Sequence, residues 1–207
     1  MLPSQRPPRI VWGRVPAWVV RWLLVPGALS LVLQTFVLGT FHVRGESMEN
    51  TLKQGDFLLI SKLEVTEAKV LRLFGRPFDY LPRRGEIVVF RLPQKPSLTL
   101  VKRVIGLPGD RVVIQDGSAK VYDARHPQGY DPAASGHAQP VGEPTDAPFD
   151  HVVSADSVFV IGDNRSPGAS SDSRAWGDLP SREIIGSVVM RLLPLQRTRL
   201  LTLETSP

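Results

Sequence analysis

The chain of 207 residues contains no cysteine. Disulfide bonds, a thiol nucleophile and cysteine-based zinc sites are therefore excluded. The four histidines, His42, His126, His137 and His151, lack the spacing of metal ligands, and each is expected to be a surface or loop residue. We accordingly expect neither a metal ion nor a cofactor.

Long basic runs are also missing, although the formal net charge is +5. Arg6, Arg9, Arg14 and Arg21 cluster beside an apolar stretch, and the other basic residues are scattered among acidic ones. Nucleic-acid binding usually needs a basic patch or stripe. Nucleic acid is therefore not expected as a partner, and the basic N-terminus is interpreted as a sign of membrane topology.

One segment, Trp22–Phe41, has twenty residues without a charge. As a helix it would measure about 30 Å, which matches the hydrocarbon core of a bilayer. The run exceeds the usual apolar region of a cleaved secretory signal, about 7 to 15 residues, and so favours a retained anchor over residues 16–41. The alternatives are a buried core helix and a signal whose removal leaves a soluble enzyme. The basic residues in 1–15 predict a cytoplasmic N-terminus, with the rest of the chain outside the cell membrane.

After the anchor, short runs rich in β-branched residues alternate with Gly, Pro and Asp turns. This pattern predicts a mainly β domain of antiparallel sheets over residues 42–122 and 151–203, with one possible helical stretch at Glu64–Phe74. Residues 123–150 are rich in Pro, Gly, Ala and Asp and are expected to form an exposed insertion or a small cap. The expected strands are Phe57–Ile60, Ile87–Arg91, Leu100–Ile105, Arg111–Gln115, Ser157–Ile161 and Ile185–Leu192.

Two residues offer a nucleophile and a base. Ser47 follows directly on the anchor, but a serine is a weak nucleophile unless a base is held within hydrogen-bond reach. Lys102 lies in LTLVKRVIGLPGD, an apolar segment that predicts a largely buried strand. Burial lowers a lysine pKa toward about 7, where the neutral amine accepts a proton. Taken alone, Lys102 fits an ordinary strand lysine that faces solvent or pairs with an acid at least as well.

Five sequence blocks change that balance. These blocks resemble, in their order, the successive blocks of the bacterial type I signal peptidases, also called leader peptidases. They are GESMENTL, GDFLLISK, RGEIVVF, VKRVIGLPGD and GDNRSPGASSDSRAWG. The resemblance covers residues 15–192. It implies a membrane-bound serine endopeptidase that removes signal peptides from exported preproteins, with a β-rich catalytic domain of coiled antiparallel sheets. It also implies that Ser47 is the nucleophile and Lys102 its general base.

The resemblance assigns supporting roles to the last block. Ser170 would orient the lysine amine, and Asp172 with Arg174 would hold that region in place. Because four residues separate Arg165 from Ser170, two more than usual, Ser166 and Ser171 stay open as alternatives to Ser170. The preceding turn is expected to tie down backbone groups; it consists of Gly162, Asp163, Asn164 and Arg165.

Two positions depart from the family pattern. Asn50 occupies the place of the proline in SMxPTL, and altered loop rigidity is the expected effect. Gly45 stands where some members carry a serine whose hydroxyl helps to bind the oxyanion. The backbone N–H of Ser47 is therefore expected to lead that role.

Substrate selectivity for small residues calls for shallow apolar pockets. The residues expected to line them, or alternatively to belong to the ordinary core, are Met48, Ile87, Val89, Phe90 and Val101. Exported preproteins, membrane lipid and the translocon are the expected partners. A maturation peptidase for conjugation pili and a non-catalytic, membrane-tethered β module are the competing functions. Self-cleaving repressors share the dyad, but they need a DNA-binding domain, and an N-terminal anchor speaks against one.

Overall fold

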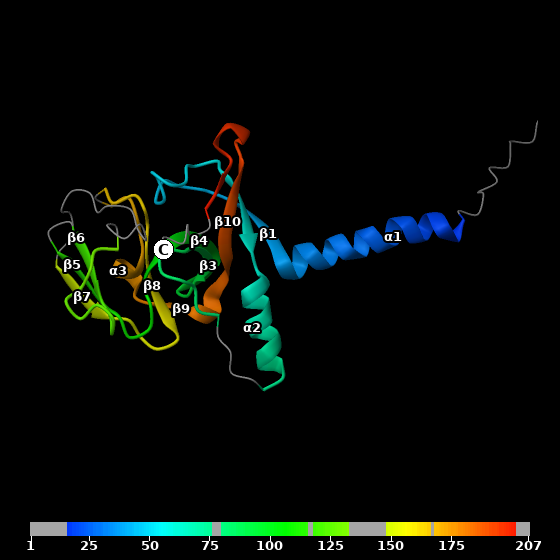
Figure 1. Cartoon of the computed structure of the whole chain (residues 1–207). Helices are drawn as coiled ribbons and strands as arrows, with labels where there is room; N and C mark the ends of the chain where they lie inside the picture. Colours follow the sequence, from blue (N-terminus) through cyan, green and yellow to red (C-terminus); the bar gives the residue numbers. More distant parts are fainter. Residues whose placement is uncertain (1–15, 76–79, 116–117, 133–147, 167, 202–207) are drawn as a thin grey trace, which may run out of the picture.

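The computed structural model describes residues 16–75, 80–115, 118–132, 148–166 and 168–201. The predicted cytoplasmic segment 1–15 lies outside these residues, as does 133–147 within the predicted insertion. One long helix projects from a β-rich body (Figure 1).

The projecting helix is α1 (Ala17–Val32), which continues into the π-helical turn η1 (Leu33–Val37). Together they provide a candidate membrane span, Trp18–Val37, of 20 residues, and none of it is buried against the protein. A helix that is apolar on all sides and has no protein partner is typical of a membrane span. The length and composition therefore suit lipid around this helix.

The span ends before the charge-free run does. Residues 38–41 are not helical but belong to β1 (Leu38–His42), which pairs antiparallel with β2 (Phe57–Ser61). The boundary of 41 predicted for the anchor therefore differs from the end of the helix at Val37. The physical reason is that the backbone groups of Leu38–Phe41 bond to β2, and composition does not distinguish an apolar strand from an apolar helix.

The main sheet has the strand order β1-β2-β10-β3-β4-β8-β9, and β11 pairs with β10. The further strands are β3 (Ile87–Leu92), β4 (Lys95–Gly106), β8 (Ser157–Ile161), β9 (Leu179–Pro180), β10 (Ile184–Leu193) and β11 (Arg199–Leu200). All of their pairings are antiparallel. The predicted mainly β, antiparallel fold class is confirmed.

A second sheet has the order β6-β5-β7. It consists of β5 (Arg111–Gln115), β6 (Ser118–Tyr122) and β7 (Phe149–Val152). Phe149 and Asp150 thus belong to a strand rather than to the insertion predicted over 123–150, because both register with β5. The short helical elements are α2 (Leu63–Leu73), α3 (Ser173–Trp176), η2 (Ser181–Glu183) and η3 (Leu195–Arg197).

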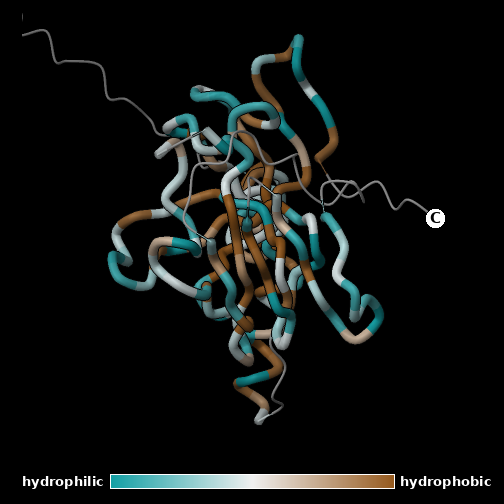
Figure 2. The backbone as a smooth tube through the Cα atoms, turned by 90° about the vertical axis from the view of Figure 1, so that its left-hand side faces the viewer, coloured by the Kyte–Doolittle hydropathy of each residue, from teal (hydrophilic) through white to brown (hydrophobic). Residues whose placement is uncertain are grey.

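All six predicted strands and the helical stretch at 64–74 are present; β5 and β8 have the predicted bounds, and the other elements are shifted by one to five residues at one end or both. In Figure 2 the hydrophobic colour concentrates in the central strands and the hydrophilic colour in the outer loops. The buried side chains form three clusters, two on the main sheet and one between β4, β8 and the small sheet. Met48 and Leu52, which lie within the loop that carries Ser47, belong to one of the clusters on the main sheet.

Candidate active site

The loop between β1 and β2 carries Ser47. Its two ends are joined by hydrogen bonds from Val43 N to Asp56 O (2.9 Å) and from Gly55 N to Val43 O (3.0 Å). Inside the loop, Leu52 N donates to Met48 O at 2.7 Å, and both side chains are fully buried. Because these apolar residues anchor the loop in the core, Ser47 is held half-buried at the surface above them.

Lys102 lies on the central strand β4 and registers with Val88 of β3. Its side chain is 2% exposed, and Nζ donates a short hydrogen bond to Ser47 Oγ. Burial lowers the pKa of Lys102 from its ordinary value to about 8, while the charges of Asp172 and Asp163 oppose that shift. The two residues predicted as nucleophile and base are therefore in contact, and the amine loses its proton more easily than a solvated lysine.

Asp172 gathers several donors beside this pair. Its carboxylate accepts hydrogen bonds from Ser170 Oγ (2.7 Å), Arg174 Nε (2.8 Å) and Gly162 N (3.2 Å). Burial alone would raise the pKa of Asp172, but the bonds and charge of Arg174, with the Ser170 hydroxyl, keep the pKa below its ordinary value. Asp172 is therefore ionised at neutral pH and stabilises positive charge on Lys102.

The predicted supporting serine is placed differently from the expectation. Ser170 reaches Asp172, whereas in the part of the chain that the structure describes the amine of Lys102 bonds to Ser47 alone. The Ser170 hydroxyl bonds the carboxylate of Asp172, and the predicted effect of Ser170 on the amine would therefore pass through Asp172. The alternatives Ser166 and Ser171 are exposed.

A second ion pair ties the central strand to the turn after β8. Arg103 Nε and Nη2 donate to the two oxygens of Asp163 at 2.8 and 2.6 Å. The same guanidinium donates to Gly85 O at 2.7 Å and to Thr51 Oγ1 at 3.3 Å. Since Thr51 lies in the loop of Ser47, this pair links that loop to β4 and to the turn.

Asn164 fixes the backbone next to the nucleophile. Its N–H donates to Ser47 O and its Nδ2 to Glu46 O, both at 3.0 Å. A Cβ added at Gly162 would collide with Ser47 O and with Ser170 Oγ, so this position has room for glycine alone. The turn after β8 therefore lies directly against the Ser47 backbone.

The model of the family described as signal peptidase, peptidase S26, matches residues 16–193. The chain belongs to this family. Among its relatives, the signal peptidase I of Leptolyngbya laminosa is 34% identical over 82% of this chain and 75% of its own length. A probable signal peptidase I-2 of Synechocystis is 30% identical over 96% of this chain and 81% of its own.

The crystal structure of a signal peptidase I from Enterococcus faecalis aligns with 53% of this chain and 98% of its own. The identity is 24% and the TM-score 0.40, an overlap too low to support an inference about the fold. The family assignment rests on the sequence match. Members of the signal peptidase family are serine endopeptidases that remove signal peptides from exported preproteins, and this chain is such an enzyme.

One contact of this signal peptidase domain was not predicted from the sequence. Arg191 Nη1 on β10 donates to Thr51 O at 3.0 Å and to Asp56 Oδ2 at 3.1 Å, and Asp56 is fully buried. An arginine in the mostly apolar run IIGSVVMRLL requires a polar partner. This requirement is the feature of the sequence from which the contact could have been predicted. Arg191 holds the far end of the Ser47 loop against the sheet.

Four of the five predicted pocket residues share one buried cluster, namely Met48, Ile87, Val89 and Val101. Phe90 belongs to the other cluster of the main sheet, where its ring lies 5.8 Å from that of Trp176. The prediction that Phe90 shares this surface is wrong, because neighbouring residues of a strand point to opposite faces.

Arg165 does not tie down backbone groups as expected. It is 6% exposed, and its Nε and Nη2 have no hydrogen-bond partner among the described residues. Burial lowers its pKa, while Asp163 and Asp172 counteract that shift. Its contribution to the site is therefore positive charge near these two carboxylates.

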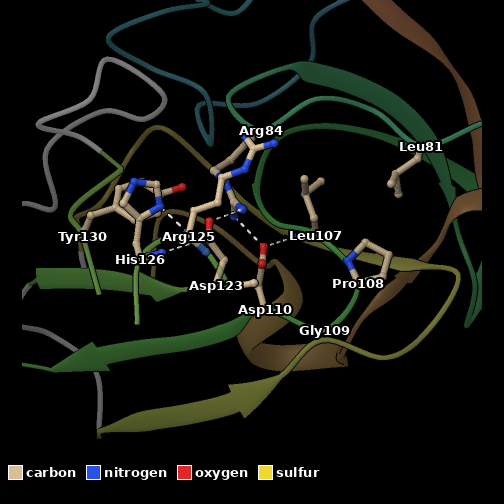
Figure 3. A pocket seen from close by; sticks show the side chains of 11 residues that line it. Leu81, Arg84, Leu107, Pro108, Gly109, Asp110, Asp123, Arg125, His126 and Tyr130 are labelled. Atoms are coloured by element: carbon tan, nitrogen blue, oxygen red, sulfur yellow. Dashed lines mark hydrogen bonds and ion pairs between the residues drawn. The ribbon is translucent and has the colours of Figure 1, made fainter. Parts of the chain in front are cut away.

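A separate hollow lies where the two sheets meet (Figure 3). There Arg84 Nη1 donates to Asp110 Oδ2 at 2.5 Å and to Ile105 O at 2.9 Å, and its guanidinium lies 5.6 Å from the Tyr130 ring centroid. Asp123 adds a further ion pair at 3.3 Å. These contacts hold together the chain segments at the ends of β4, β5 and β6. Within the described residues, no group of His, Asp or Glu is arranged to hold a metal ion.

Proposed function

We propose that Ser47 and Lys102 carry out the removal of signal peptides as nucleophile and general base. The observation that supports this most strongly is the hydrogen bond between Lys102 Nζ and Ser47 Oγ at an amine that is 2% exposed. A buried amine with a pKa of about 8 is neutral in a useful fraction of molecules and accepts the hydroxyl proton.

The reaction then runs in two halves. Ser47 Oγ bonds to the scissile carbonyl carbon as its proton passes to Lys102, and the resulting ammonium gives a proton to the departing amine of the mature protein. Water hydrolyses the acyl-enzyme ester, again with Lys102 accepting the proton. The first half leaves Lys102 as a neutral amine and Ser47 as an ester. In the second half the ammonium gives its proton to the departing Ser47 Oγ, which restores the hydroxyl and the neutral amine.

The oxyanion of both halves is assigned to the backbone N–H of Ser47. Among the described residues this N–H has no hydrogen-bond acceptor, which leaves it available to a developing negative charge. Gly45 has a φ of +88°, a conformation that strains a serine side chain. A hydroxyl at position 45 is therefore a poor substitute for the N–H in this chain.

The supporting residues act through charge and position. Asp172, fixed by Arg174 and Ser170, raises the pKa of Lys102 and so keeps the amine basic enough to accept a proton. Asn164 and the Arg103–Asp163 pair hold the Ser47 loop against β4. These are positioning roles, and their loss is expected to cost less activity than loss of the dyad.

Small substrate residues are proposed to bind over the cluster of Met48, Ile87, Val89 and Val101. These side chains are at most 6% exposed, so they form a floor rather than a deep cavity. A shallow apolar floor accepts small side chains and excludes large ones by contact.

The topology proposed for this enzyme is a single span with a cytoplasmic N-terminus and the catalytic domain outside the cell membrane. Because β1 follows η1 without a linker, Ser47 stays close to the outer membrane surface. Exposed apolar residues suit lipid contact where β2 begins and where β10 turns through η3 into β11, a region called here the β10–β11 edge; they are Phe57, Leu193, Leu195 and Leu200. The translocon is a further proposed neighbour, since preproteins emerge there.

The test is cleavage of a purified preprotein by the full chain in vesicles. Ser47→Ala should abolish cleavage, and Lys102→Ala should lower it by about 10²- to 10⁴-fold, since it removes the base. Lys120→Ala is the matched control, because Lys120 is an exposed strand lysine on β6. Circular dichroism checks the fold of each variant. Full activity in Lys102→Ala would assign the base to another residue.

A further inference from the structure

Helix α2 starts beside the end of the membrane span. Lys62 N donates to Val37 O at 2.8 Å, and Thr66 Oγ1 donates to Phe36 O at 2.8 Å. Lys62 Nζ also reaches Gln34 O at 3.0 Å. These bonds fix the first turn of α2 to η1, at the level where the chain leaves the apolar span.

Apolar side chains lie on two opposite sides of α2 and differ in their contacts. Val65 and Ala68 pack into the core and are 6% exposed each. At about 3.6 residues per turn, Leu63, Val70 and Phe74 fall on the side opposite these two residues, and Thr66 and the exposed Glu67 lie between Leu63 and Val70. Leu63 is 54%, Val70 43% and Phe74 79% exposed, and the neighbouring Leu73 is 84% exposed. Val70, Leu73 and Phe74 are neighbours at i, i+3 and i+4, and an exposed apolar patch of this kind is typical of a surface that contacts a partner or a membrane.

The patch faces the side on which the span leaves the protein. In Figure 1, α1 leaves the β body to the right, and α2 runs downward across that direction with the sheets on its left. The buried face of α2 contacts the body, so the opposite face looks away from the body toward the side of α1. A span that crosses a bilayer along its normal places a crosswise helix at its base along the membrane surface.

We propose that α2 lies in the interface of the bilayer and inserts Leu63, Val70, Leu73 and Phe74 at the boundary of headgroups and acyl chains. The inference rests on the proposed membrane span and extends the lipid contact beyond the β10–β11 edge. Lys69, which is exposed on the same helix, lies within reach of lipid phosphates. A helix with an apolar patch that begins at a membrane anchor continues an existing membrane contact, and lipid is therefore the occupant.

This contact would give the catalytic domain a second attachment. A single helix allows the β body to tilt about its base, whereas a helix lying in the surface restricts that tilt. Ser47, whose loop follows β1 directly, would then keep a constant height above the bilayer.

The absence of cysteine permits a direct test with single fluorescent labels. The full chain is inserted in vesicles of phosphatidylcholine and phosphatidylglycerol, with an environment-sensitive probe on Phe74→Cys, Val152→Cys or Leu29→Cys. Val152 is the matched control, an exposed apolar residue (58%) of the small sheet, and Leu29 in α1 (57%) reports the span. Quenching is measured with nitroxide-labelled lipid and with aqueous iodide.

We expect the label at 74 to shift to the blue and to lose most of its emission to nitroxide lipid, as the label at 29 does. The label at 152 should respond to iodide alone. A label at 74 that responds to iodide like that at 152, while 29 is quenched by lipid, overturns the inference and leaves the span intact. Iodide access at 29 overturns it as well. The same labels in Ser47→Ala, which has lost cleavage, separate this outcome from the catalytic proposal.

Discussion

At the scale of single residues, the site depends on one amine that is buried but not isolated. Desolvation lowers the pKa of Lys102 to about 8, and the two carboxylates nearby keep it from falling further. Arg174 acts on the same amine in the opposite direction to Asp172. The basicity of Lys102 is thus set by a balance that single substitutions can shift either way.

This balance predicts opposite pH shifts for two variants. The neutral amine is the reactive form, so kcat/KM should rise with pH and level off above about 8. Asp172→Asn removes a charge that raises the pKa of Lys102, and the rising limb should move to lower pH. Arg174→Gln removes a charge that lowers this pKa, and the limb should move to higher pH.

The measurement is a pH–rate profile with a short soluble peptide. Asp150→Asn serves as the control, because Asp150 is an exposed partner of Arg111 on the small sheet and should leave the limb unchanged. Shifts of the same sign in both variants, or none in either, would contradict the assignment of Lys102 as the base.

The sequence predicted the chemical residues better than their contacts. Ser47 and Lys102 lie in distinctive sequence blocks, and a serine and a lysine side chain indicate a nucleophile and a base. The partner of Ser170 could not be predicted, because whether a hydroxyl bonds an amine or a carboxylate depends on packing that the order of residues does not contain. Arg191 was missed because it lies 140 positions from Thr51, to which it donates.

At the scale of elements, the loop of Ser47 is held from three directions. Asn164 bonds Glu46 in its first part, Arg103 bonds the side chain of Thr51, and Arg191 bonds Thr51 O and Asp56 at its end. The loop also contains Asn50 with a φ of +83°, a left-handed conformation that asparagine tolerates and proline cannot adopt. The replacement of the family's proline by Asn50 therefore accompanies a different backbone, and not merely a change in rigidity.

Substitutions at position 50 should rank by their tolerance of positive φ. Asn50→Gly should leave the free energy of unfolding nearly unchanged, and Asn50→Ala should lower it by about 1 kcal/mol. Asn50→Pro should lower it by more than about 1 kcal/mol and reduce kcat, because the loop must move. Denaturant unfolding and peptide cleavage measure both effects. A stable and fully active proline variant would show that the loop takes another conformation.

The elements themselves were largely predictable. β5 and β8 have the predicted bounds because β-branched runs end at clear turn signals there. β1 was merged with the span, since Leu38–Phe41 is as apolar as the helix before it. β7 was missed because only Val152 among its four residues carried a strand signal in the sequence. The strand forms because its backbone pairs with β5.

At the scale of the whole molecule, the span and the β body are nearly independent in their packing. None of this candidate span is buried against the body, so it contributes little to the folding of the body, and its proposed role is to set the location of the enzyme. The benefit of such tethering is a high effective concentration of a substrate that is held in the same membrane. Catalytic power and access to substrate are therefore located in different parts of the chain.

Removal of residues 1–32 should separate these two contributions. The β body should stay folded, and hydrolysis of a short soluble peptide should be nearly unchanged, because no residue of the dyad or its partners is lost. Cleavage of a preprotein embedded in vesicles should fall by about 10²-fold or more, since the reaction loses its tether. An unrelated apolar helix fused at residue 33 should restore most of the loss, because location rather than sequence matters. Equal cleavage of the embedded preprotein by the full and shortened chains would show that the body finds the membrane without the span, through α2 and the β10–β11 edge.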